Sequence, residues 1–232
     1  MESTAFLTEA RELLGKIEKV VEDERLKRQL EKAENKLDYV VKNLKYDNID
    51  LAKLVRDKAS EVYSKISSTR TRELPKEAVD ELKRLIKWCG LAVYDFTDKI
   101  NDVKRAYRAF IWGMIIFFIL GGSFNQPFAI SALLLALPAI MAMSFLKKRR
   151  VTGYILALTT IPLPLVIFVN IVFYSVYALT NPSELSNTAS QLGMGVAEFT
   201  ILLSLVLIGG LAGLILLTYA VATLYKTRDA YI

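Results

Sequence analysis

The fold is decided by a stretch without a single charged side chain, residues 109–146, which reads AFIWGMIIFFILGGSFNQPFAISALLLALPAIMAMSFL. Two further stretches, 151–183 and 199–225, also lack charged residues. Each of the three exceeds the roughly 20 apolar residues that a helix needs to cross the hydrocarbon core of a bilayer. None alternates with the period of two that is typical of a membrane strand. The sequence therefore predicts an all-α membrane protein.

A turn signal divides the first stretch at 121–127, where two glycines and a proline fall within seven residues. With this turn, the apolar part of the chain predicts four transmembrane helices. They cover about 108–123, 127–146, 151–179 and 196–225. The two limbs of the first hairpin are short, about 17 residues or about 26 Å each. A re-entrant hairpin that enters the membrane without crossing it would leave the same pattern, so both alternatives stay open.

Charge separates the chain into two parts. Residues 1–108 hold 24 Lys/Arg and 21 Asp/Glu, whereas residues 109–232 hold 6 and 3. This imbalance predicts a cytosolic helical bundle or coiled coil over 1–107 and a transmembrane domain over 108–232. Both signs are interleaved in the first part, which argues against nucleic-acid binding. A single cysteine excludes a disulfide scaffold.

The positions of Lys and Arg predict the orientation in the membrane. Basic clusters lie at 104–108, 147–150 and 226–228, whereas the opposite loops around 121–127 and 180–195 contain no Lys or Arg. Basic residues prefer the cytosolic side. We therefore expect a multi-pass protein of the cell membrane with both termini in the cytosol. The absence of His together with abundant Lys and Glu is typical of an archaeal thermophile.

Apolar residues recur at helical spacing through the charged part and predict four helices there. The phase of the apolar positions changes across 22–25, which predicts a turn or a stutter. A second turn is expected at 46–48, with Asp47 or Asn48 as the N-cap of the third helix. Residues 67–72 are expected to form a loop, and Pro75 is expected at the first position of the fourth helix.

The fourth helix is predicted to run on into the membrane. From Val79 to Phe110 the apolar residues follow steps of three and four without interruption. This pattern predicts one continuous helix from 76 to at least 120, about 66 Å long. Such a helix could carry force or conformation between cytosol and membrane, or it could simply connect the bundle to the first span.

Two interruptions of the third and fourth spans are the candidate intramembrane site. Prolines interrupt the third span and glycines the fourth, at similar depth. Interrupted helices that meet in mid-membrane can hold an ion or a small solute, whereas kinks and close packing are the simpler interpretation. The residues of this candidate site are Thr159, Thr160, Pro162, Pro164, Gly209 and Gly213.

Two other polar residues belong to the candidate set. Asn170 is the only amide well inside a predicted span, and we expect it to form an interhelical hydrogen bond. Glu198 lies at the outer start of the last span. It either faces the water at the headgroups or forms a proton or cation site.

The sequence offers no catalytic constellation. It has no His, no phosphate-binding or dinucleotide-binding glycine motif and no metal-ligand spacing, so we expect no catalytic residue, cofactor or metal. Cys89 follows the apolar spacing and is interpreted as a core residue. We expect a non-enzymatic membrane protein whose bundle binds a cytosolic or membrane protein or further copies of itself. The alternative is an oligomeric small channel or transporter for an ion or small solute.

Overall fold

The computed structural model describes residues 1–68, 75–124 and 126–231, and these residues form helices without any strand. The all-α prediction is therefore confirmed. The described chain divides into two compact units, Met1–Asp102 and Val103–Tyr231.

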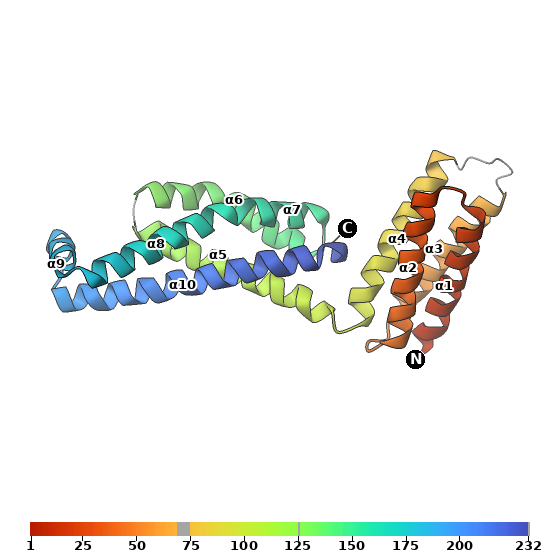
Figure 1. Cartoon of the computed structure of the whole chain (residues 1–232), viewed down its shortest axis with the longest axis horizontal. Helices are drawn as coiled ribbons and strands as arrows, with labels where there is room; N and C mark the ends of the chain where they lie inside the picture. Colours follow the sequence, from red (N-terminus) through yellow and green to blue (C-terminus); the bar gives the residue numbers. More distant parts are fainter. Residues whose placement is uncertain (69–74, 125, 232) are drawn as a thin grey trace. The chain divides into compact units, whose positions relative to one another are not determined.

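The first unit, which we call the four-helix unit, consists of four helices that pack side by side (Figure 1). Helix α1 packs against α2 and α3, and α4 packs against the same two helices. Leucines at helical spacing are fully buried between them, for example Leu7, Leu30 and Leu82. Burying each such side chain stabilises the fold by about 1.5–3 kcal/mol. The helices span Glu2–Val20 (α1), Glu24–Lys42 (α2), Ile49–Ser68 (α3) and Lys76–Phe96 (α4).

The two predicted turns of this unit are confirmed, and side chains fix both. Asp23 caps α2 by accepting hydrogen bonds from the backbone N–H groups of Arg25 at 2.7 Å and Leu26 at 3.4 Å. Asn48 accepts from the backbone N–H of Leu51 at 3.1 Å and caps α3. Of the two residues predicted for this cap, Asn48 is therefore the one that forms it.

Asp47 caps a different helix. Its Oδ1 accepts hydrogen bonds from the backbone N–H of Ser3 at 3.2 Å and from the Ser3 hydroxyl. The carboxylate thereby ties the start of α1 to the turn between α2 and α3. These hydrogen bonds from Ser3 lower the pKa of Asp47 below its usual value.

Two smaller expectations near α3 and α4 need revision. Helix α3 continues to Ser68, and residues 69–72 of the predicted loop lie outside the described residues. Pro75 is the N-cap of α4 instead of its first helical residue, with φ −56° and ψ 144°.

The prediction of one continuous helix from 76 to 120 is wrong. Helix α4 ends at Phe96, and α5 (Ile100–Phe124) begins only after a three-residue break. Thr97 takes an extended conformation, with φ −125° and ψ 172°. A break of three residues leaves Phe96 and Ile100 four positions apart, so the apolar spacing continues undisturbed across it.

Contacts from the α2–α3 turn fix this break. The Phe96 carbonyl accepts hydrogen bonds from the backbone N–H groups of Lys45 at 2.9 Å and Tyr46 at 3.3 Å. The Lys45 ammonium also pairs with the Asp98 carboxylate. The end of α4 thus has hydrogen-bond partners from outside the helix, as helix ends require.

The second unit contains the apolar helices. Three described segments are long and apolar enough to cross a membrane, namely Ala129–Lys147, Val151–Thr180 and Val196–Lys226. Helix α5 is not among them. After α5, the second unit contains α6 (Gln126–Lys147), α7 (Val151–Thr160), α8 (Pro162–Thr180), α9 (Pro182–Gln191), α10 (Val196–Lys226) and the 3-10 turn η1 (Arg228–Ala230).

The helical ends differ from the prediction at the two loops expected on the outer side. Helix α5 continues to Phe124 and α6 begins at Gln126, so most of the predicted turn at 121–127 is helical, while Asn125 lies outside the described residues. The predicted loop at 180–195 contains α9, which packs against α8 and α10. Ala189 of α9 is buried there with Phe199 of α10.

The three basic clusters gather at one end of the second unit. Gly113 of α5 lies against Leu217 of α10, and Leu120 lies against Gly209, so the two helices run in opposite directions. The ring of Tyr154, near the start of α7, stacks on that of Tyr231 at 5.5 Å. The start of α5, the α6–α7 connection and the end of α10 therefore lie at the same end.

We expect the cap at Asp47 to make the four-helix unit sensitive to acid. A carboxyl group whose pKa is lowered by folding stabilises the fold above its unfolded pKa and loses that contribution as the pH falls through the folded pKa. Asp47→Asn should therefore lower the urea midpoint at pH 7 and flatten its fall between pH 5 and pH 2. Fluorescence of Trp88, in a full-length Trp112→Phe background in detergent, would report the unfolding. An unchanged pH profile would contradict the cap.

Candidate functional site

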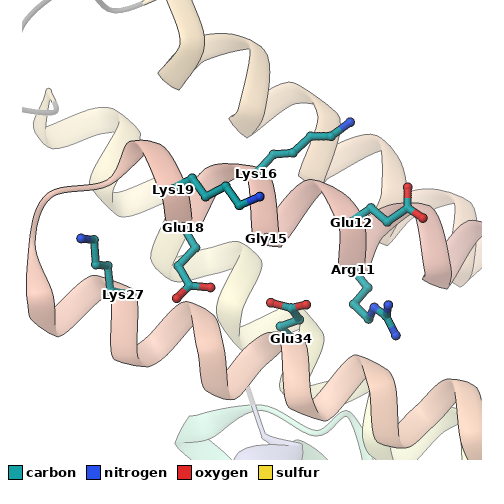
Figure 2. A pocket seen from close by; sticks show the side chains of 8 residues that line it. All are labelled: Arg11, Glu12, Gly15, Lys16, Glu18, Lys19, Lys27 and Glu34. Carbon is teal, nitrogen blue, oxygen red and sulfur yellow. The ribbon is translucent and has the colours of Figure 1, made fainter.

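An open groove of about 620 Å³ runs along α1 and α2 (Figure 2). Charged side chains of both signs surround it, and one glycine forms part of its wall. The lining residues are Arg11, Glu12, Gly15, Lys16, Glu18, Lys19, Lys27 and Glu34.

The helical period places these side chains on the surface. Leu14 and Ile17 of α1 and Leu30 of α2 point into the core, so the positions between them face outward. At one end of the groove, the Arg11 guanidinium donates to Asp38 Oδ1 at 2.7 Å. This ion pair joins the two helices that form the walls.

Asp38 is held by two cations. Its other oxygen lies 2.6 Å from the Lys42 ammonium. The hydrogen bond from Lys42, with the charge and hydrogen bond of Arg11, keeps the pKa of Asp38 below its usual range. Asp38 therefore stays ionised well below neutral pH, and the Arg11 pair persists with it.

Gly15 is the feature of the groove that packing does not explain. A Cβ at this position would have only the Glu34 carboxylate nearby, with its oxygens at 3.7 and 3.8 Å, which is ordinary van der Waals contact. Glycine inside a helix costs about 0.5–1 kcal/mol relative to alanine. Figure 2 shows Glu34 on the opposite helix, facing the stretch of α1 that contains Gly15. The missing side chain therefore opens the groove at a cost to helix stability.

Sequence reasoning did not select these groove residues. The available signal was Gly15 itself, because it is the only glycine in residues 1–73 and lies in the middle of a predicted helix. The location of the groove depends on which helices pack together, and this does not follow from spacing along one helix.

The proline interruption of the third span is mild in the structure. Ile161, between α7 and α8, keeps helical angles of φ −67° and ψ −37°. Its N–H donates to the Ala157 carbonyl at 3.1 Å, and its carbonyl accepts from Leu165 at 3.2 Å. The backbone thus stays helical at Ile161, directly before Pro162 and three residues before buried Pro164.

The two threonines before the prolines bond within their own helix. The Thr159 hydroxyl donates to the Leu156 carbonyl at 3.0 Å. The Thr160 hydroxyl bonds to the carbonyls of Leu156 at 2.9 Å and Ala157 at 3.1 Å. Both hydroxyls therefore donate to carbonyls of the preceding helical turn. They do not donate to the carbonyls that lack a backbone N–H partner because of Pro162 and Pro164.

The glycines of α10, the predicted fourth span, pack against neighbouring helices of the same chain. A Cβ at Gly213 would lie 2.2 Å from Cζ of the buried Phe168 of α8. A Cβ at Gly209 would lie 3.2 Å from Leu120 Cδ1 of α5. The Phe168 ring also meets Phe117 of α5 edge-on, with ring centres 6.3 Å apart. Side chains thus fill the space beside the glycines, which favours close packing over a site there.

The two remaining polar candidates are exposed. Asn170 Nδ2 donates to the Val166 carbonyl of its own helix at 2.9 Å, and the expected interhelical bond is not formed among the described residues. Glu198 Oε2 accepts from the Gly195 N–H at 3.2 Å and caps the start of α10. This cap supports the interpretation of Glu198 as an interfacial residue.

Cys89 lies in the core of the four-helix unit, as predicted. Its side chain is fully buried, and burial raises the pKa of its thiol to about 12. A thiol with such a pKa is protonated at neutral pH and is a poor nucleophile. In the described part of the chain, no three Cys, Asp or Glu side chains are grouped so that they could hold a metal ion.

Comparison with known proteins finds no family model that matches this chain, and no curated protein or solved structure matches it either.

The packing of the glycines predicts unequal effects of adding one methyl group. Gly213→Ala should destabilise the second unit by about 1–3 kcal/mol, because the buried Phe168 ring must move. Gly209→Ala, the matched control, meets only the end of a half-buried leucine and should cost less than about 1 kcal/mol. Thermal unfolding in detergent, followed by Trp112 in a Trp88→Phe background, would measure both. Equal losses would contradict this account of the packing.

Proposed function

We propose that this chain is a non-enzymatic multi-pass membrane protein whose four-helix unit binds a protein partner in the groove between α1 and α2. The observation that carries this proposal is Gly15, which opens the groove although the packing of the unit has room for a side chain. A backbone without a side chain lets another chain approach closely.

The charges of the groove indicate the chemistry of the partner. Four cations and three carboxylates alternate along it. Glu18 and Glu34 form no ion pair within the described residues. A protein segment that carries both acidic and basic side chains would complement this pattern, and its binding would weaken as salt screens the charges. The apolar side chains in the core of the four-helix unit are buried, so a partner would contact its exposed polar surface.

The membrane part of the proposal is a four-span arrangement with both termini in the cytosol. The gathering of all three basic clusters at one end of the second unit supports it, because basic residues favour the cytosolic side. The three span-capable segments supply the second, third and fourth spans. Helix α5 supplies the first crossing, and a re-entrant hairpin formed by α5 and α6 is the alternative.

Single-cysteine labelling would test this topology. The native Cys89 is buried and should stay silent. In sealed vesicles with the native orientation, an impermeant maleimide should label Asn187→Cys from outside and Lys148→Cys only after permeabilisation. Asn125→Cys should be labelled from outside if α5 crosses fully and protected if the hairpin is re-entrant. External labelling at Lys148→Cys would overturn the arrangement.

Substitutions at Gly15 would test the groove. Gly15→Ala should raise the free energy of unfolding by about 0.5–1 kcal/mol, because alanine favours the helix. Gly15→Leu should fill the groove and abolish partner binding. A photo-crosslinking residue at Lys19, in membranes of the source cells, should capture one partner, and molar salt should reduce the yield.

The controls are a crosslinker at Asp57, on the exposed surface of α3, and Lys32→Leu, on an exposed face of α2 outside the groove. The first should capture nothing, and the second should leave the yield at Lys19 unchanged. The groove would be excluded as the binding surface if Gly15→Leu kept the same yield, or if position 19 captured no protein.

A further inference from the structure

One face of α8 combines exposed apolar side chains with a single amide. The exposed fractions are 58% for Val166, 74% for Phe173 and 55% for Tyr177, and Asn170 is exposed between them. Residues four apart lie on the same face of a helix, so Val166 and Asn170 are neighbours along this face. The remaining exposed surface here is apolar, as expected for contact with lipid.

Asn170 lies within the hydrocarbon region if this segment crosses a membrane. The segment Val151–Thr180 has its midpoint between residues 165 and 166. Asn170 is therefore about 7 Å along the helix from the midpoint, at 1.5 Å per residue. The hydrocarbon core extends about 15 Å to each side of its centre. Neither water nor headgroups are available to the amide at that depth.

The amide is only partly satisfied within the chain. Asparagine offers two N–H donors and a carbonyl oxygen that accepts. One N–H bonds to the Val166 carbonyl at 2.9 Å, and the described residues give the other N–H and Oδ1 no partner. Lipid chains supply neither donors nor acceptors, so an exposed amide is unfavourable unless another helix meets it.

We propose that this face of α8 is a self-association surface, on which Asn170 pairs with Asn170 of a second copy. Each amide donates its remaining N–H to the Oδ1 of the other, so both deficits are met at once. A second copy fits because the amide is complementary to itself. In a dimer with a two-fold axis beside Asn170, the two copies of this residue face each other, so no second type of binding surface is needed. The inference rests on the membrane placement in the proposed function, but not on the groove of the four-helix unit.

Two other surfaces among the described residues of the second unit lack this feature. The exposed face of α6 presents Leu133, Leu134 and Leu137, which lipid satisfies. The two glycines spaced four apart on α10, a common dimerisation motif, are already occupied by Leu120 and Phe168 of the same chain. The amide on α8 therefore marks the surface for the second copy.

Energy transfer between donor- and acceptor-labelled full-length protein in liposomes, measured over a range of protein-to-lipid ratios, would test the proposal. Wild type should associate. Asn170→Val should weaken association about tenfold, the effect of losing a pair of interhelical hydrogen bonds. Asn170→Gln should retain association, because it restores the amide. Circular dichroism should be unchanged in both variants, since Asn170 bonds only within its own helix.

Disulfide crosslinking would locate the surface. Val166→Cys, one turn from a retained Asn170, should form a dimer under oxidation, whereas Leu134→Cys on α6 should not. Equal crosslinking at both positions, or unchanged association of Asn170→Val, would overturn the proposal. The proposal would also be overturned if the wild type stayed monomeric at every protein-to-lipid ratio. The partner of this face would then be another membrane protein. If maleimide labelling at Lys148→Cys and Asn187→Cys also failed, the membrane placement itself would be wrong.

Discussion

The hydrocarbon core of a membrane supplies no hydrogen-bond partner, and this constraint applies to the second unit wherever its three span-capable segments cross a membrane. Several of its hydroxyl groups bond to backbone carbonyls one turn earlier. Thr180 bonds to Val176 at 2.9 Å, and Ser204 bonds to Thr200 at 2.7 Å. Such bonds satisfy a hydroxyl inside its own helix, so they contribute nothing to contacts between helices. Polar groups therefore do little to hold these helices together.

Close packing of complementary surfaces, and not polar contacts, holds the helices of the second unit together. Gly213 lets Phe168 approach the backbone of α10, and Gly153 of α7 lies so close to the end of α6 that a Cβ would meet its backbone at 2.4 Å. The four-helix unit works differently, because buried leucines drive its packing while ion pairs such as Arg11–Asp38 stay at the surface. The surface that offers varied recognition chemistry is consequently that of the four-helix unit.

Sequence reasoning succeeded where the signal was local. Apolar spacing gave the helices, and the residue types at 47 and 48 gave Asn48 as one of two candidates for the cap of α3. It failed where partners are distant: Asp47 finds Ser3 across 44 residues, and the break after Phe96 is held by a different turn. Helix α9 had a usable signal in Pro182 at its first position. The groove and the partners of each glycine required the packing itself.

Two residues of α8 show how these constraints separate internal packing from external contact. Ser175 is fully buried, and its hydroxyl has no partner in the described chain. A hydroxyl can rotate to the carbonyl one turn back, as Thr180 and Ser204 do, so its deficit has a solution within α8. Asn170 has already made that bond to Val166 and still has a donor and an acceptor that point outward. Its deficit has no solution within the described residues, and this difference from Ser175 is the reason for assigning the proposed contact with a second copy to α8.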